Sequence, residues 1–148
     1  MKYCVTLLFL IGFPIAVHAE TPQSDAARKW GLIGVWAINC DAPASRENPY
    51  YIYASEGGGL YVRRDSGDFK DVNEVVSAKI IDENQFEISI DFKKFSRTMT
   101  AVYGKISNDK FRSRSNVDGS GHYTIKDGKL THNGELSPVM NRCVRPVS

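Results

Sequence analysis

Apolar and polar residues alternate along most of this chain with the period of a β-strand. Phe86, Ile88, Ile90 and Phe92 are separated by polar residues, so one face of this segment is apolar and the other is hydrated. Shorter stripes of the same kind occur at Trp36, Ile38 and Cys40, at Leu60 and Val62, at Met99, Ala101 and Tyr103, and at Tyr123 and Ile125. The pattern predicts an antiparallel all-β protein, because such sheets commonly bury one face and hydrate the other.

Turn-forming residues separate the apolar stripes at short, regular intervals. They occupy residues 42–49, 57–59, 66–68, 82–84, 107–109, 118–119 and 127–128. The pair Asp127-Gly128 is the sharpest hairpin signal, because a tight two-residue turn needs positive φ. The spacing predicts about eight antiparallel strands, which suits either a closed up-and-down β-barrel or a β-sandwich.

The chain of 148 residues has room for one ordinary domain. We expect a leader and one short helix within residues 20–33, with Ser24 or Asp25 capping a helical stretch over residues 26–29. Residues 34–148 are then expected to form a single β-domain.

Residues 1–19 have the order of a secretory signal peptide. Lys2 precedes an apolar run over residues 5–17, and Ala19 ends a stretch that suits signal peptidase. The run is too short for a comfortable membrane span, and we expect no transmembrane segment after cleavage. Cleavage after residue 19 removes Cys4 and leaves Cys40 and Cys143, so the sequence predicts an exported protein, periplasmic or secreted.

Cys40 and Cys143 are expected to form a disulfide between the first strand and the last. In an up-and-down barrel these two strands pair, and the pairing removes both exposed sheet edges. A sandwich can also bring its termini together. The bridge therefore favours the barrel and leaves the sandwich as an alternative.

Gly34-Val35-Trp36 opens the first predicted strand directly after the predicted helix. This arrangement resembles the Gly-x-Trp start of lipocalin-like, calycin-type barrels, in which an arginine from the last strand packs over the tryptophan. The resemblance implies that Arg142 or Arg145 lies over Trp36, where a guanidinium can stack on the indole ring. This chain is shorter than typical lipocalins, and its hairpins are tight.

The two ends of the β-domain carry a second similarity. Cys40-Asp41 near the start and Asn141-x-Cys143-x-Arg145 at the end resemble the pattern of small exported proteobacterial proteins without an assigned activity.

The sequence offers little catalytic chemistry. The net charge of +2 is too balanced for an obvious nucleic-acid-binding protein. His122 and His132 flank the predicted hairpin without a third metal ligand nearby, and are better interpreted as solvent-facing. With Cys40 and Cys143 bridged, no free thiol remains for nucleophilic chemistry. We expect no catalytic residue, metal or cofactor, and a protein that is not an enzyme.

Two groups of side chains are candidates for contact with a ligand or partner. The first is aromatic and consists of Tyr50, Tyr51, Tyr53 and Tyr61. Strand alternation sends Tyr51 and Tyr53 to the face opposite Tyr50, and tyrosines at a barrel mouth can line a ligand site.

The second group is basic. Residues 93–114 contain seven basic side chains against the single acid Asp109. Lys110, Arg112 and Arg114 alternate with other residues and share one strand face, which could dock an anionic envelope polymer, lipid head groups or an acidic protein. The simpler interpretation is a solvated face that keeps the barrel soluble.

These observations favour a non-catalytic binding protein of the bacterial cell envelope, which holds a small amphipathic or apolar ligand or an anionic partner. One alternative is an exported inhibitor of an envelope protease or lysozyme, with loop 41–48 or 66–71 entering the cleft of that enzyme. The other is a structural envelope protein. A ligand-binding barrel needs an internal cavity, whereas a barrel packed solid by Trp36, Phe86 and Met99 leaves no room.

Overall fold

A computed structural model describes residues 19–144. The predicted signal peptide up to residue 18 and the candidate Arg145 lie outside the described residues. One helix and ten strands follow each other along the chain: α1 (Pro22–Trp30), β1 (Gly34–Ala37), β2 (Tyr50–Glu56), β3 (Gly59–Asp65), β4 (Lys70–Ile80), β5 (Gln85–Phe92), the short 3-10 turn η1 (Lys93–Phe95), β6 (Arg97–Ser107), β7 (Lys110–Asp118), β8 (Tyr123–Lys126), β9 (Lys129–Leu130) and β10 (Val139–Cys143).

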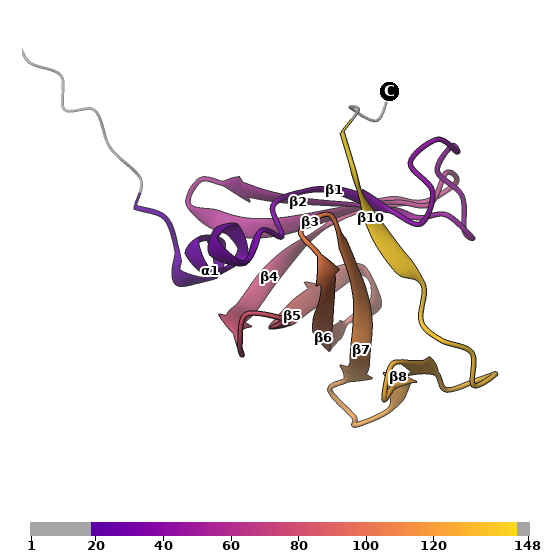
Figure 1. Cartoon of the computed structure of the whole chain (residues 1–148). Coiled ribbons are helices and arrows are strands. Elements are labelled where there is room, and N and C mark those ends of the chain that lie inside the picture. The colour runs from indigo at the N-terminus through magenta and orange to yellow at the C-terminus, as the bar shows by residue number, and fades with distance from the viewer. Residues whose placement is uncertain (1–18, 145–148) are drawn as a thin grey trace, which may run out of the picture.

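The strands form a closed antiparallel barrel (Figure 1). Strands β1 to β7 pair in chain order, and β10 pairs with both β1 and β7, which closes a ring of eight strands. The hairpin of β8 and β9 is added beside β7, and its turn has positive φ at both Asp127 and Gly128. The predicted up-and-down barrel is therefore confirmed, and the sandwich alternative is wrong.

Helix α1 closes one end of the barrel. It begins with Pro22 and is capped by Thr21, whose side chain accepts a hydrogen bond from the backbone N–H of Ser24. The prediction of Ser24 or Asp25 as the cap is wrong, because Ser24 is buried and donates instead to the carbonyl of Gly58 at 3.1 Å. Trp30, on the buried face of the helix, points into the barrel and stacks on Phe86, with ring centroids 5.2 Å apart.

The half of the barrel near α1 is solidly packed. Trp36, Phe86, Leu32, Leu60 and Ile88 are almost completely buried there. The Trp36 indole N–H donates to the carbonyl of Leu32 at 2.7 Å, and the ring centroids of Trp36 and Phe111 lie 4.7 Å apart. Every polar atom of this indole is therefore satisfied within an apolar core.

Arg142 of β10 lies over Trp36, with its guanidinium carbon 4.5 Å from the ring centroid. The same guanidinium donates to the carbonyls of Ile33 and Gly31. Gly34 makes room for it, because a Cβ at this position would lie 2.7 Å from Arg142 Nη1. Its φ of 141° is also one that other residues rarely adopt. Close approach of the arginine therefore explains why glycine starts this strand.

A disulfide joins Cys40 to Cys143. Strand β1 ends at Ala37, so Cys40 lies in the following loop and not in the first strand as predicted. The loop folds back over the outer face of the sheet, where Ala37, Tyr50 and Cys143 form a small second core. Among residues 19–144, no helix is long and apolar enough to cross a membrane.

Candidate functional site

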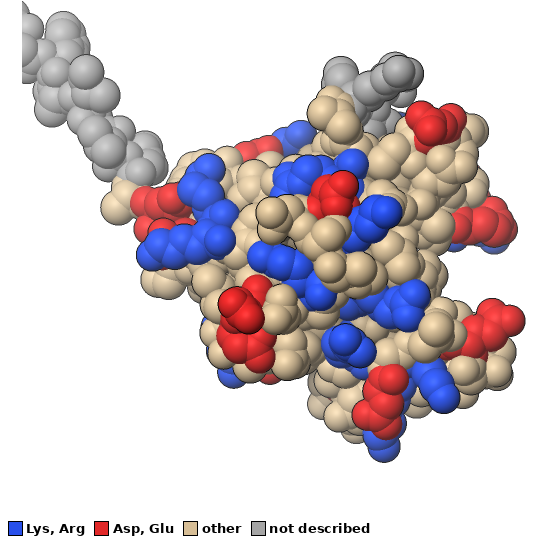
Figure 2. Space-filling view, viewed as in Figure 1, with Lys and Arg blue, Asp and Glu red and all other residues tan. Residues whose placement is uncertain are grey.

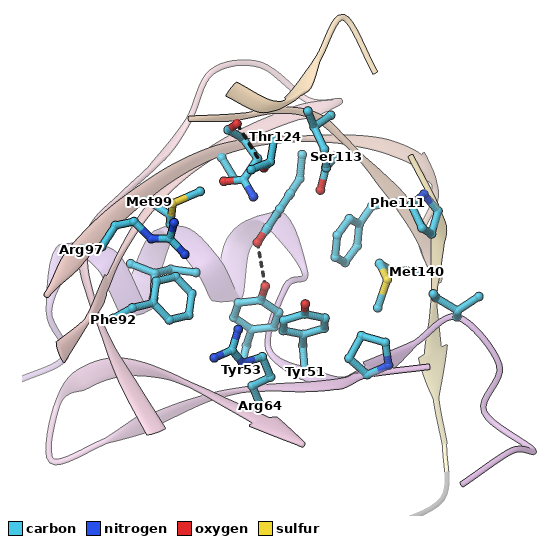
Figure 3. Close-up of a pocket in the computed structure, with 18 of the residues that line it drawn as sticks. Tyr51, Tyr53, Arg64, Phe92, Arg97, Met99, Phe111, Ser113, Thr124 and Met140 are labelled. Carbon is cyan, nitrogen blue, oxygen red and sulfur yellow. Dashed lines mark hydrogen bonds between the residues drawn. The ribbon is translucent and has the colours of Figure 1, made fainter. Parts of the chain in front are cut away.

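The barrel is hollow at the end opposite α1. A cavity of about 310 Å³ lies there, between strands that also supply the solid half of the core (Figure 3). Its apolar lining includes Ile38, Pro49, Tyr51, Tyr53, Ile90, Phe92, Phe95, Met99, Ala101, Tyr103, Phe111, Ile125, Pro138 and Met140, and its polar lining consists of Arg64, Arg97, Ser113, Asn116 and Thr124.

Strand alternation places the polar groups at one end of the apolar stripes. On β3, Leu60 and Val62 are buried, and the next residue on the same face is Arg64. On β6, the buried stripe of Met99, Ala101 and Tyr103 is preceded on the same face by Arg97. Each apolar stripe therefore begins in the packed part of the core and ends at an arginine near the open end of the barrel, Arg64 on β3 and Arg97 on β6.

The positive charge of Arg64 is neutralised by an ion pair within the cavity wall. Its Nη2 lies 2.6 Å from a carboxylate oxygen of Asp71, whose side chain is only 8% exposed. The guanidinium carbon also lies 5.0 Å from the ring centroid of Phe69 and 5.1 Å from that of Phe92. An arginine held by a buried carboxylate and two rings is a fixed part of the cavity wall.

Arg97 differs from Arg64 in having no ion-pair partner among the described residues. Its guanidinium points toward the cavity from the start of β6 (Figure 3). The Oδ1 atom of Asn116 is buried in the same cavity wall and accepts no hydrogen bond from residues 19–144. A buried acceptor without a donor costs free energy, so this wall is suited to a ligand that brings one.

Two tyrosines cross the cavity and bond to each other. The hydroxyls of Tyr53 on β2 and Tyr103 on β6 lie 2.8 Å apart (Figure 3). Burial raises the pKa of Tyr51 and of Tyr103, and burial together with the neighbouring Tyr103 raises the pKa of Tyr53 well above its ordinary value. All three phenols are therefore neutral across the physiological range.

This burial predicts a loss of stability in alkali. An unfolded chain releases tyrosine protons from about pH 10, whereas the folded barrel keeps those of Tyr51, Tyr53 and Tyr103. The folded state then binds more protons, so the free energy of unfolding falls as pH rises above about 10, by up to about 1.4 kcal/mol per pH unit for each phenol.

Urea unfolding at increasing pH, followed by phenolate absorbance, measures this loss. The absorbance of these tyrosines should rise together with unfolding, and Tyr53→Phe should reduce the pH slope. A rise in their phenolate absorbance while the barrel stays folded would contradict the burial argument.

The candidate tyrosines do not form one site. Tyr51 and Tyr53 line the cavity, as their shared strand face predicted. Tyr50 faces outward, where its hydroxyl donates to the carbonyls of Ala42 at 2.8 Å and Cys40 at 3.1 Å. Tyr61 lies on the outward face of β3, beside Gly59. Tyr50 therefore holds the loop after β1, and neither it nor Tyr61 belongs to the cavity.

The basic candidates lie on the other side of the barrel wall. Lys110, Arg112 and Arg114 alternate on β7 with Phe111, which is buried in the core. They share the outward face, as the alternation predicted, and do not reach the cavity. Among the described residues, no group of three or more histidine, cysteine or acidic side chains could hold a metal ion.

Sequence reasoning missed most of the polar cavity wall. Arg64, Arg97 and Asn116 were not among the candidates. The sequence did contain a signal for the two arginines, because each occupies the next inward-facing position beyond an apolar stripe. Arg64 comes two residues after Val62, and Arg97 comes two residues before Met99. No comparable signal marks Asn116, since the residues just before it on β7, Ser113 to Ser115, are polar on both faces.

Comparisons with known proteins inform the fold. No family model matches the sequence, and no curated protein is significantly similar to it. Among solved structures, the chain is similar to pallilysin (Tp0751) of Treponema pallidum, with a TM-score of 0.50 over 82% of this chain and 89% of that one. Only 13% of the aligned residues are identical. The likeness therefore supports the barrel fold alone.

Proposed function

We propose that this protein is an exported, non-enzymatic carrier that holds a small amphipathic anion inside its barrel. The observation that carries the proposal is the cavity of about 310 Å³, whose apolar interior ends at Arg97, a cation without an ion-pair partner among residues 19–144. Small-molecule sites are commonly concave and apolar, with a few placed polar groups. The carboxyl end of the ligand would contact Arg97, and its apolar end would lie against Phe111 and Met140.

The volume limits the size of the ligand. Water occupies about 30 Å³ per molecule in the liquid, so a cavity of 310 Å³ has room for about ten heavy atoms. This lies at the lower end of the range of ligand sites. A medium-chain carboxylate such as octanoate fits this size, whereas a long-chain lipid does not. Asn116 Oδ1 additionally favours a ligand with a hydroxyl or amide donor.

Export and the absence of catalysis are part of the proposal. The Cys40–Cys143 bridge supports an oxidising compartment, as does the signal-peptide pattern of residues 1–19. The Gly34-Val35-Trp36 start and the position of Arg142 support a lipocalin-like carrier of the bacterial cell envelope. Within the cavity, the Tyr53 and Tyr103 hydroxyls bond to each other and Arg64 is held by Asp71, which suits a binding wall.

Calorimetric titration with three ligands of equal chain length tests the proposal. Octanoate should bind at least about tenfold more tightly than octanol, because a charge-assisted hydrogen bond to Arg97 contributes about 1.5–3 kcal/mol. Octylamine should bind more weakly than octanol. Arg97→Gln should remove the preference for octanoate while octanol still binds.

Arg63→Gln is the matched control, because Arg63 is an exposed cation on the outward face of β3. It should leave all three affinities unchanged. Equal affinities for octanoate and octylamine in the wild-type protein would contradict an anionic ligand.

A further inference from the structure

A surface groove of about 590 Å³ lies on the outside of β6 and β7. It runs between the start of β5, at Asn84 and Gln85, and the hairpin of β8 and β9, at Tyr123, Lys126 and Asp127. The same two strands line the internal cavity through their inward residues. The groove and the cavity are therefore separate sites on opposite sides of one wall.

Unpaired cations gather on this face of the protein. Figure 2 shows lysine and arginine side chains spread over the region of β7 and β8. Lys110, Arg112 and Arg114 lie on the outward face of β7, and Lys126 lies on β8. None of these four belongs to an ion pair with any residue in the described part of the chain. The face therefore keeps its positive charge.

The backbone fixes Arg114 along the floor of the groove. The register between β6 and β7 shifts at this point, so Arg114 is the extra residue of a bulge, and bulges re-aim side chains. Its side chain lies across Gly104, where an added Cβ would come within 2.6 Å of Arg114 Nε. Glycine at residue 104 lets the arginine lie flat, which orders its guanidinium before any ligand arrives.

The other lining groups suit a ligand that carries hydroxyls. Tyr123 offers an aromatic face beside Lys126, whose Nζ lies 5.5 Å from the ring centroid. Asp127 offers a carboxylate acceptor. The amides of Asn84 and Gln85 border the groove and already donate to Glu83 at 3.3 Å and to Asp82 at 3.1 Å, so their carbonyl oxygens face a ligand with hydroxyl donors. Lys105 also borders the groove, but its ammonium is engaged by the carbonyl of Trp30 at 2.9 Å.

The side chains that line the groove carry more positive than negative charge, because Lys105, Arg114 and Lys126 outnumber Asp127. Asp127 is the one carboxylate that lines it among the described residues. Two further carboxylates, Asp82 and Glu83, lie at its rim on the amides of Gln85 and Asn84. Glu87, which pairs across the sheet with the groove residue Val102, is bound to Lys79 at 3.0 Å.

We propose that this groove binds an anionic polysaccharide, with Arg114 and Lys126 on its carboxylate or phosphate groups and Tyr123 against a sugar ring. The proposal goes beyond the internal carrier site and depends on different side chains. A chain-like polyanion fits better than a flat lipid surface because the site is concave. It fits better than a simple anion because the groove is lined by two cations on different strands, Arg114 and Lys126, beside the ring of Tyr123.

Binding of an alginate hexasaccharide, a chain of uronic acids, tests the proposal. Calorimetry at low salt should detect binding of the alginate hexasaccharide but not of maltohexaose, a neutral chain of equal length. Affinity should fall as salt is added, because opposite charges at a surface are screened. Arg114→Gln combined with Lys126→Gln should weaken binding by about tenfold or more.

The matched control is Lys29→Gln combined with Arg46→Gln, which removes the same charge from exposed positions outside the groove. It should change the affinity by less than about twofold. Tyr123→Ser should weaken binding without changing the charge. An unbound alginate hexasaccharide, or an equal loss in the control variant, would overturn the proposal. So would full competition by inorganic phosphate, or groove-dependent binding to anionic phospholipid vesicles in place of the oligosaccharide.

Discussion

Replacing Cys40 and Cys143 together by serine should lower the free energy of unfolding by about 4–5 kcal/mol. The bridge closes a loop with a sequence separation of 103 residues, and a crosslink of that span removes much conformational freedom from the unfolded chain. It also ties the loop after β1 to the end of β10, over the buried Tyr50. For a domain of this size, the melting temperature should fall by roughly 15 °C.

Thermal unfolding followed by circular dichroism measures this effect. The wild-type protein in a reducing agent should unfold at the temperature of the double serine variant. The same reductant should not change the melting temperature of that variant. If the reduced wild-type protein melted within about 2 °C of the oxidised one, the barrel would not depend on its bridge.

Ala101→Phe should abolish binding of octanoate. Ala101 is buried on β6 and lines the cavity, and phenylalanine adds six heavy atoms to a space that holds about ten. The remaining space is too small for an eight-carbon acid. Because the new ring fills a void among apolar residues, the free energy of unfolding should be unchanged or higher.

Calorimetric titration gives the loss of affinity for octanoate, and urea unfolding verifies that the variant is folded. Ala54→Phe is the matched control, because Ala54 lies on β2 between the inward residues Tyr53 and Ser55 and is paired with the outward Tyr61. The control should bind octanoate as the wild-type protein does. Unaltered octanoate affinity in a folded Ala101→Phe variant would place the ligand elsewhere.

Much of the fold could be predicted because it depends on local patterns. The period-two stripes set the inward faces of β5 and β6, and Asp127-Gly128 marks a turn that needs positive φ at both residues. The position of the helix cap was harder to predict. Thr21 and Ser24 can both cap, and a tertiary hydrogen bond from Ser24 to Gly58 decides between them.

The cavity could not be predicted, because alternation tells which side chains face inward but not how much space they fill. Near α1, Trp30 from the helix reaches Phe86 and fills the barrel. At the other end no α-helix of residues 19–144 enters, and the 3-10 turn η1 adds only Phe95 to the cavity wall. The inward Ser113 and Ala101 are too small to meet across the interior. The function of Arg64 depends on Asp71, and that pairing requires knowledge of the register between β3 and β4.

Native mass spectrometry of the protein recovered from its native cells tests the carrier proposal most directly. The wild-type protein should carry one small organic acid in addition to the mass of the disulfide-closed chain. The Ala101→Phe variant from the same cells should have the bare mass. A bare wild-type protein that also fails to take up added octanoate would contradict the account.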